Sequence, residues 1–243
     1  MLNKFLVDIC EHQSPKIAEG CKRFFKTKEG EYSYHDLFLG VPAPILRKIA
    51  KNYFKNLTLK DLNITIQDKY HEVRACSLMV LILQYQKKED EKTRKNIFDF
   101  YLSNTNHINN WDLVDISAAN IVGNYLYKYN QKNSQQILYK LANTEHLWSQ
   151  RIAIVATHYF IKQKQYDLTF ELSKKFFTHQ HDLIQKAVGW MLREVGKQDK
   201  LVLKSFLEKY SESMPRSTLR YALEKFNNTE RKYFLHVRNK SLS

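Results

Sequence analysis

The stretch HEVRACSLMVLILQY, residues 71–85, decides the fold class. Its residues Leu78, Leu81 and Ile82 recur at intervals of three and four, which is the spacing of one face of an α-helix. The whole chain has only 4 prolines and 6 glycines in 243 residues. Sheet proteins need more turn residues than this, so the chain is predicted to be all-α.

Three further stretches can be laid over the first, namely NWDLVDISAANIVGNYL (110–126), LWSQRIAIVATHYF (147–160) and LIQKAVGWMLREV (183–195). Each of the four carries one polar residue ahead of a run of small and apolar residues. We call these four polar residues the ridge residues. They are Arg74, Asp115, Arg151 and Lys186, and successive members lie 41, 36 and 35 positions apart. HEAT-type helix pairs repeat at roughly 40 residues. Residues 1–243 are therefore predicted to form one superhelical solenoid of HEAT-like repeats, with the ridge residues along a concave, basic face.

Helix starts are predicted at polar residues. Ser14 followed by Pro15 is typical of an N-cap and a first helical residue. The further predicted caps are Thr58, Asp90, Asn110 and Ser134. No Ser/Gly-rich linker interrupts the chain, so a single structural unit is the simplest prediction.

The charge balance predicts a polyanionic partner. Lys and Arg number 39 against 25 for Asp and Glu, a formal net charge of +14. Nucleic acid or an anionic membrane surface would fit this excess, and mere solubility is the alternative. No apolar run approaches the ~20 residues of a membrane span, and Lys4 and Asp8 interrupt any signal peptide. The scattered Cys10, Cys21 and Cys76 indicate reduced thiols in a cytoplasmic protein.

All three tryptophans lie beside a ridge residue. Trp111 precedes the ridge aspartate by four positions, Trp190 follows the ridge lysine by four, and Trp148 precedes the second ridge arginine by three. These spacings place each pair on one helical face. Core packing is the favoured interpretation for Trp148. For Trp111 and Trp190, core packing and a functional role are equally open.

Asp115 does not fit a phosphate-binding ridge, because a carboxylate repels phosphate. It either forms an internal salt bridge, to Arg151 or another neighbour, or a helix-end contact, or it stabilises positive charge that develops in a transition state. Spacing alone favours the structural interpretation.

From Asn110 to Asp115 the sequence resembles the AlkD-type DNA alkylation repair glycosylases. The resemblance continues in FLGVPAPILRKIAK (38–51), LWSQRIAI (147–154), IQKAVGWMLREVGK (184–197) and MPRSTLRYALEKF (214–226). The chain departs from the family at Asn110, where some members carry an aromatic residue, and at Pro42 and Ala43, which replace polar residues. Residues 1–34 match weakly.

The resemblance implies a monofunctional glycosylase. It would excise cationic N3- and N7-alkylpurines from duplex DNA that lies in the concave groove, without a deep base pocket. By position, Asp115 matches the catalytic carboxylate, Trp111 and Trp190 match residues that contact the deoxyribose, and Arg151 matches a basic residue of the same site. The cations expected on the DNA backbone are Arg47, Lys186 and Arg193 from the resemblance and Arg74 from the ridge.

Such a site suits the chemistry. An N3- or N7-alkylpurine is already cationic and leaves without a general acid, so the remaining task is to stabilise an oxocarbenium-like sugar. One carboxylate near C1′ can do so and orient water. Each adjacent aromatic face would add roughly 0.5 to 2 kcal/mol.

Other chemistries lack their motifs. The chain has no HExxH, CxxC, Walker loop or GxGxxG, so neither metal nor cofactor is expected. His179-Gln180-His181 is interpreted as a solvated loop, and Lys186 as a phosphate contact rather than a Schiff-base lysine. The alternative function is a non-catalytic HEAT-like module that binds damaged or branched DNA, or a protein scaffold. A monomer is expected.

Overall fold

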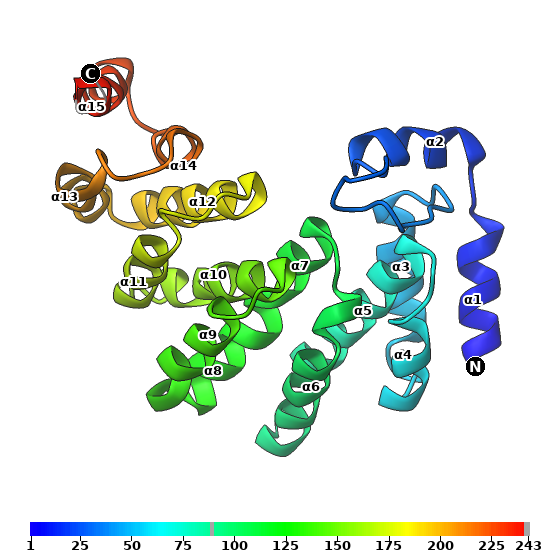
Figure 1. Cartoon of the computed structure of the whole chain (residues 1–243). Helices are drawn as coiled ribbons and strands as arrows, with labels where there is room; N and C mark the ends of the chain where they lie inside the picture. The colour runs from blue at the N-terminus through cyan, green and yellow to red at the C-terminus, as the bar shows by residue number, and fades with distance from the viewer. Residues whose placement is uncertain (88–89, 241–243) are drawn as a thin grey trace. The chain divides into compact units, whose positions relative to one another are not determined.

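The computed structural model is all-α, as predicted (Figure 1). It describes residues 1–87 and 90–240, with side chains described as far as His236. No β-strand occurs in these residues, and one isolated bridge joins Leu37 to Tyr70. The helices gather into two compact units, Met1–Ser117 and Ala118–Ser243. One domain over residues 1–243 therefore stays a prediction.

The first unit is organised around α5. Its elements are α1 (Leu2–Glu11), α2 (Pro15–Phe24), α3 (Ala43–Tyr53), α4 (Leu59–Thr65), α5 (His71–Lys87), α6 (Glu91–Ser103), the 3₁₀ turn η1 (Thr105–His107) and α7 (Trp111–Ala118), which ends at the unit boundary. Helix α5 packs against α1, α3, α4 and α6. Its first eight residues are all buried, which is why its sequence has no polar face.

The second unit is organised around α10 and α12. Its elements are the π-helical turn η2 (Ala119–Gly123), α8 (Asn124–Tyr129), the 3₁₀ turn η3 (Gln131–Asn133), α9 (Ser134–Ala142), α10 (Leu147–Lys162), α11 (Asp167–Lys175), α12 (Asp182–Gln198), α13 (Lys200–Tyr210), α14 (Arg216–Ala222) and α15 (Asn228–Lys240). Helix α10 packs against η2, α8, α9, α11 and α12, and α12 packs against α13 and α14. No described helix is long and apolar enough to cross a membrane.

Two predicted caps form side-chain bonds to the helix. The hydroxyl of Thr58 accepts from the backbone N–H of Asp61 at 3.2 Å, and the Asp61 carboxylate accepts from the backbone N–H of Thr58 at 2.8 Å. This reciprocal capping box starts α4. Asp90 starts α6 by accepting from the backbone N–H of Thr93 at 2.7 Å.

The other predicted caps differ in detail. Ser14 is the N-cap of α2 and Pro15 its first residue, as predicted, but Ser14 makes no side-chain cap bond. The prediction for Ser134 was wrong by one position, because Asn133 is the N-cap and Ser134 begins α9. Asn110 precedes α7 with its side chain buried among polar partners.

The sequence His179-Gln180-His181 is not simply a solvated loop. His181 Nδ1 accepts from the backbone N–H of Leu183 at 3.2 Å and so caps α12. His179 accepts from the backbone N–H of His181 at 3.0 Å, and its Nε2 pairs with Gln150 at 2.9 Å. The two rings therefore organise the start of α12.

Candidate functional site

Helix α7 presents two of the predicted site residues. Trp111 and Asp115 lie one turn apart, and both are partly exposed. Leu113 and Val114, on its other side, are fully buried. Burial raises the pKa of the Tyr101 phenol, and the nearby Asp115 charge raises it further. The apolar side of α7 thus fixes the helix in the core and leaves the indole and the carboxylate accessible.

The indole of Trp111 belongs to an aromatic cluster. It stacks on Phe25, with ring centroids 5.5 Å apart and the rings inclined by 28°. Phe24 meets Trp111 edge-on at 5.7 Å and is 64% exposed. An exposed apolar surface next to a candidate site indicates a contact surface. Sequence reasoning missed Phe24, although an aromatic pair directly after two basic residues was a visible signal.

A buried polar network lies at the start of α7. Asp36 accepts from Arg74 Nη2 at 2.5 Å and from Asn110 Nδ2 at 2.9 Å. The Nε2 atom of His71 lies 2.8 Å from Asp112 Oδ2, and its Nδ1 atom lies 3.5 Å from Asp36 Oδ2. All of these residues except Asp112 are at most 5% exposed. Two carboxylates and two cations therefore balance one another inside the first unit.

The network keeps its members charged. Burial opposes protonation of His71, but the charge and hydrogen bond of Asp112, together with Asp36, outweigh it and raise the pKa of His71 to about 9. Burial also opposes ionisation of Asp36, yet its bond to His71 and the charge of Arg74 hold its pKa below the ordinary value. At neutral pH the imidazolium and the Asp36 carboxylate coexist.

The burial of Arg74 argues against its predicted contact with the DNA backbone. Its side chain is only 5% exposed. One guanidinium nitrogen donates to the carbonyl of Asp68 at 2.8 Å, and another pairs with Asp36. No surface remains on which a phosphate could rest. Arg74 instead ties the segment before α5 into the buried network.

Arg47 has the exposure that a phosphate contact requires. Arg47 and Lys51 both lie exposed on α3. They line a surface pocket of about 220 Å³ together with Ile116 of α7, the residue next to Asp115. Within the first unit, two cations of α3 therefore lie beside the exposed face of α7.

In the second unit, α12 carries three predicted site residues on one face. Lys186, Trp190 and Arg193 follow one another at spacings of four and three residues, and all are partly exposed. The indole of Trp190 donates to Glu194 Oε1 at 3.0 Å. Arg193 pairs with Glu224 and, at 3.4 Å, with Glu194. Glu194 therefore fixes the position of Trp190, and Glu194 and Glu224 together fix that of Arg193.

The remaining predicted residues of this unit are buried. Trp148 is 6% exposed, so the core interpretation favoured by the sequence is confirmed. Arg151 is 5% exposed and donates to the carbonyl of Leu183 at 2.5 Å. This bond anchors the first turn of α12 to α10. The burial of Arg151 argues for a structural role rather than the predicted contact with substrate.

A cationic pocket adjoins Lys186. It has a volume of about 430 Å³, and Arg220 of α14 and Arg231 of α15 also line it. Asp182 and Glu224 contribute two carboxylates to the same lining. Sequence reasoning did not single out Arg220 or Arg231, since nothing in the local pattern brings α14 and α15 to the start of α12.

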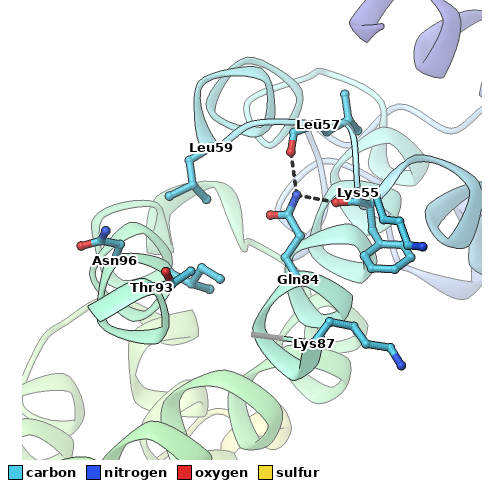
Figure 2. Close-up of a pocket in the computed structure, with 9 residues that line it drawn as sticks. Lys55, Leu57, Leu59, Gln84, Lys87, Thr93 and Asn96 are labelled. Atoms are coloured by element: carbon cyan, nitrogen blue, oxygen red, sulfur yellow. Dashed lines mark hydrogen bonds between the residues drawn. The ribbon is translucent and has the colours of Figure 1, made fainter. Parts of the chain in front are cut away.

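A separate pocket opens towards the end of α5 (Figure 2). Its volume is about 620 Å³, and Leu57 and Lys87 are among the residues lining it. Gln84 donates to the carbonyls of Phe54 and Leu57 at 2.8 and 2.7 Å. Gln84 follows His71 by 13 positions in one helix, or roughly 20 Å at about 1.5 Å per residue. The pocket is therefore remote from the network under Trp111.

The model of the family described as DNA alkylation repair enzyme matches residues 8–226. This chain belongs to that family. The match confirms the resemblance found in the sequence and supports a role in the repair of alkylated DNA. Among curated proteins, no match to this chain is found.

A solved structure gives the fold of a similar protein. It is described as a predicted DNA alkylation repair enzyme from Enterococcus faecalis, with a TM-score of 0.69 and 17% sequence identity. The match covers 89% of this chain and 98% of that one. At this identity the likeness shows the fold alone, and it agrees with the all-α class.

Proposed function

We propose that this member of the DNA alkylation repair family is a monofunctional glycosylase that releases cationic N3- and N7-alkylated purines from duplex DNA. The observation that carries the proposal is the pair Trp111 and Asp115, partly exposed and one turn apart on α7. A chain of net charge +14 that only bound DNA would gain nothing from a carboxylate on that face.

The reaction needs little from the protein beyond charge and orientation. The bond between C1′ and the purine nitrogen breaks, and its electron pair neutralises the cationic base, which leaves. The Asp115 carboxylate stabilises the oxocarbenium-like sugar. A water oxygen then bonds to C1′ and loses its proton to Asp115 or to solvent. The face of Trp111 favours the same positive charge through its quadrupole.

The two units would contribute separate parts of the DNA contact. Arg47 and Lys51 lie exposed on α3, and Phe24 adds an exposed aromatic ring beside Trp111. In the second unit, Lys186 and Arg193 are the phosphate contacts, and Trp190 is the second aromatic surface. The protein would act as a monomer without metal or cofactor.

The decisive experiment measures free base released from duplexes that contain N7-methylguanine or N3-methyladenine. Asp115→Asn keeps the size of the side chain and removes its charge, so the excision rate is expected to fall by about 10²-fold or more. Asp99→Asn is the matched control, because Asp99 is an exposed carboxylate of α6 paired with Lys95. The control should excise base at the rate of the wild type.

The outcomes separate the possible functions. Full excision by Asp115→Asn would remove the catalytic role of this carboxylate. If the wild type bound duplex DNA and released no base, the protein would instead be a non-catalytic module for damaged or branched DNA. Circular dichroism of each variant shows that it is folded before its activity is compared.

A further inference from the structure

His71, at the first position of α5, is buried among aromatic rings and carboxylates. Its ring packs against both Phe25 and Phe38, with centroid distances of 4.9 and 5.0 Å, and those two phenyl rings stack on each other at 5.2 Å. Its Nε2 atom bonds Asp112 at 2.8 Å, and its Nδ1 atom faces Asp36 at 3.5 Å. Its side chain is 4% exposed. The imidazole therefore has almost no freedom to move.

Two polar routes lead from His71 to the residues that flank Trp111, one beginning with the hydrogen bond to Asp112 and the other with the ion-pair contact to Asp36. Asp112 Oδ2 accepts a hydrogen bond from His71 Nε2, and Asp112 Oδ1 accepts one from the backbone N–H of Leu113 at 2.9 Å. Asn110 donates to Asp36 at 2.9 Å and accepts from the backbone N–H of Trp111 at 2.8 Å. The residue before Trp111 and the residue after it are thus both fixed by the same buried network.

A third route runs through the aromatic rings. Phe25 contacts His71, with ring centroids 4.9 Å apart, and also stacks on the indole of Trp111. The ring of His71 therefore also limits where Phe25, and with it the face of Trp111, can lie. Asp115 is one turn further along α7, so a change in the first turn of this helix moves both candidate residues together.

A network of this kind is a costly way to fill a core. Buried ion pairs contribute less stability than well-packed apolar residues of similar volume, but they specify one geometry. Here His71, which is buried and charged, occupies a position where an apolar side chain could pack against Phe25 and Phe38. What the charges achieve is a defined position for the start of α7.

We propose that His71 is a positioning residue of the repair site. Its bond to Asp112 fixes the first turn of α7 and thereby sets the orientation of Trp111 and the place of Asp115. The inference rests on the proposed glycosylase function for its catalytic consequence, while the positional consequence stands on the geometry alone.

The positional consequence is tested first, without reference to activity. In the background Trp148→Phe/Trp190→Phe, Trp111 is the one remaining tryptophan. Adding His71→Gln is expected to shift the emission of Trp111 and to raise its accessibility to acrylamide. Asp112→Asn, which keeps the shape of the partner, should produce the same change. The double variant should change the emission by less than the sum of the two single changes, because both changes break the bond between these two side chains.

The catalytic consequence is tested in the chain with all three tryptophans. His71→Gln should slow single-turnover excision by about tenfold or more, since small displacements at a reacting centre are costly. Its dissociation constant for the same duplex should stay within about twofold, because the phosphate contacts lie on other helices. His12→Gln, at an exposed histidine just after α1, is the control and should change neither quantity.

Several results would overturn the inference. A folded His71→Gln variant with unchanged Trp111 emission and quenching would show that the histidine does not position the indole. A loss of duplex affinity by the same factor as the loss of excision rate would show a binding defect rather than a change in the position of the site residues. If the wild-type chain released no base, the proposed function would fail alone, and the fluorescence of Trp111 would still decide the positioning role.

Discussion

The charged state of His71 predicts an unusual dependence of stability on pH. Its pKa is about 9 in the folded chain and about 6.5 in an unfolded one. Because the folded value is the higher, the stabilisation is fully present below about pH 6.5 and is lost as the pH rises through about 9. At about 1.4 kcal/mol for each unit of pKa, the loss amounts to about 3 kcal/mol.

The groups facing His71 make this direction specific. Asp36, from the connection between α2 and α3, and Asp112, from α7, are the carboxylates that retain the proton. Arg74, on α5 itself, opposes them. Cys21, from α2, lies in the same cluster, and burial raises the pKa of its thiol. The thiol therefore stays neutral over most of the window in which His71 loses its proton.

Urea unfolding at about pH 6.5, 7.5, 8.5 and 9.5 measures this effect. The quantity to compare is the difference in unfolding free energy between the wild type and His71→Gln, because groups that titrate in both proteins cancel. This difference should fall by about 3 kcal/mol across the series. A difference that stays constant with pH, or an imidazole NMR signal of His71 that titrates near its ordinary pKa, would refute the reasoning. His12→Gln should show no such trend.

Three further predictions follow from packing and exposure. A Cβ at Gly189 would lie 2.5 Å from the carbonyl oxygen of Thr218 and 2.5 Å from Tyr221 Cβ. Gly189→Ala should therefore lower the free energy of unfolding in urea by about 1 to 3 kcal/mol. An unchanged urea midpoint would contradict the close packing of α12 on α14. Phe24→Ala should change the free energy of unfolding by no more than about 0.5 kcal/mol, since Phe24 is 64% exposed. The same variant should bind alkylated duplex DNA more weakly. Unchanged affinity would show that Phe24 is not part of the contact surface. Arg47→Ala should reduce the slope of log affinity against log salt by about 1, and an unaltered slope would show that this arginine meets no phosphate.

The fold class was predictable because it depends on local information. The long helices contain little glycine and proline, and their apolar residues recur at helical spacing. Thr58 and Asp90 correctly marked the starts of α4 and α6. Burial of residues 151–157 in α10 was also visible as nearly continuous apolar sequence, whereas the buried first eight residues of α5 include His71, Glu72 and Arg74. Boundaries that depend on a single polar residue were less secure, as the displacement from Ser134 to Asn133 shows.

The surroundings of Trp111 were not predictable in the same way. Its neighbours Phe24 and Phe25 come from the last residue of α2 and the position after it, and His71 comes from α5, so their approach depends on tertiary packing. His71 is the first residue of the stretch 71–85, and its sequence context gives no sign of a special role. Only the carboxylates of Asp36 and Asp112 on either side reveal its charge.

The four ridge residues occupy aligned positions in the sequence but differ in how far their side chains are exposed. Arg74 and Arg151 are both buried, and each guanidinium donates to a backbone carbonyl near the start of a long helix, Asp68 before α5 and Leu183 in α12. Arg74 fixes the segment that precedes its own helix, whereas Arg151 of α10 anchors the first turn of α12. The other two ridge residues, Asp115 and Lys186, remain partly exposed. Spacing aligned all four positions, but exposure, which spacing does not encode, separates the two buried arginines from Asp115 and from Lys186, which pairs with Asp182 at 2.6 Å. An alanine at either arginine should therefore first reduce stability, whereas Asp115→Asn should first reduce the excision rate.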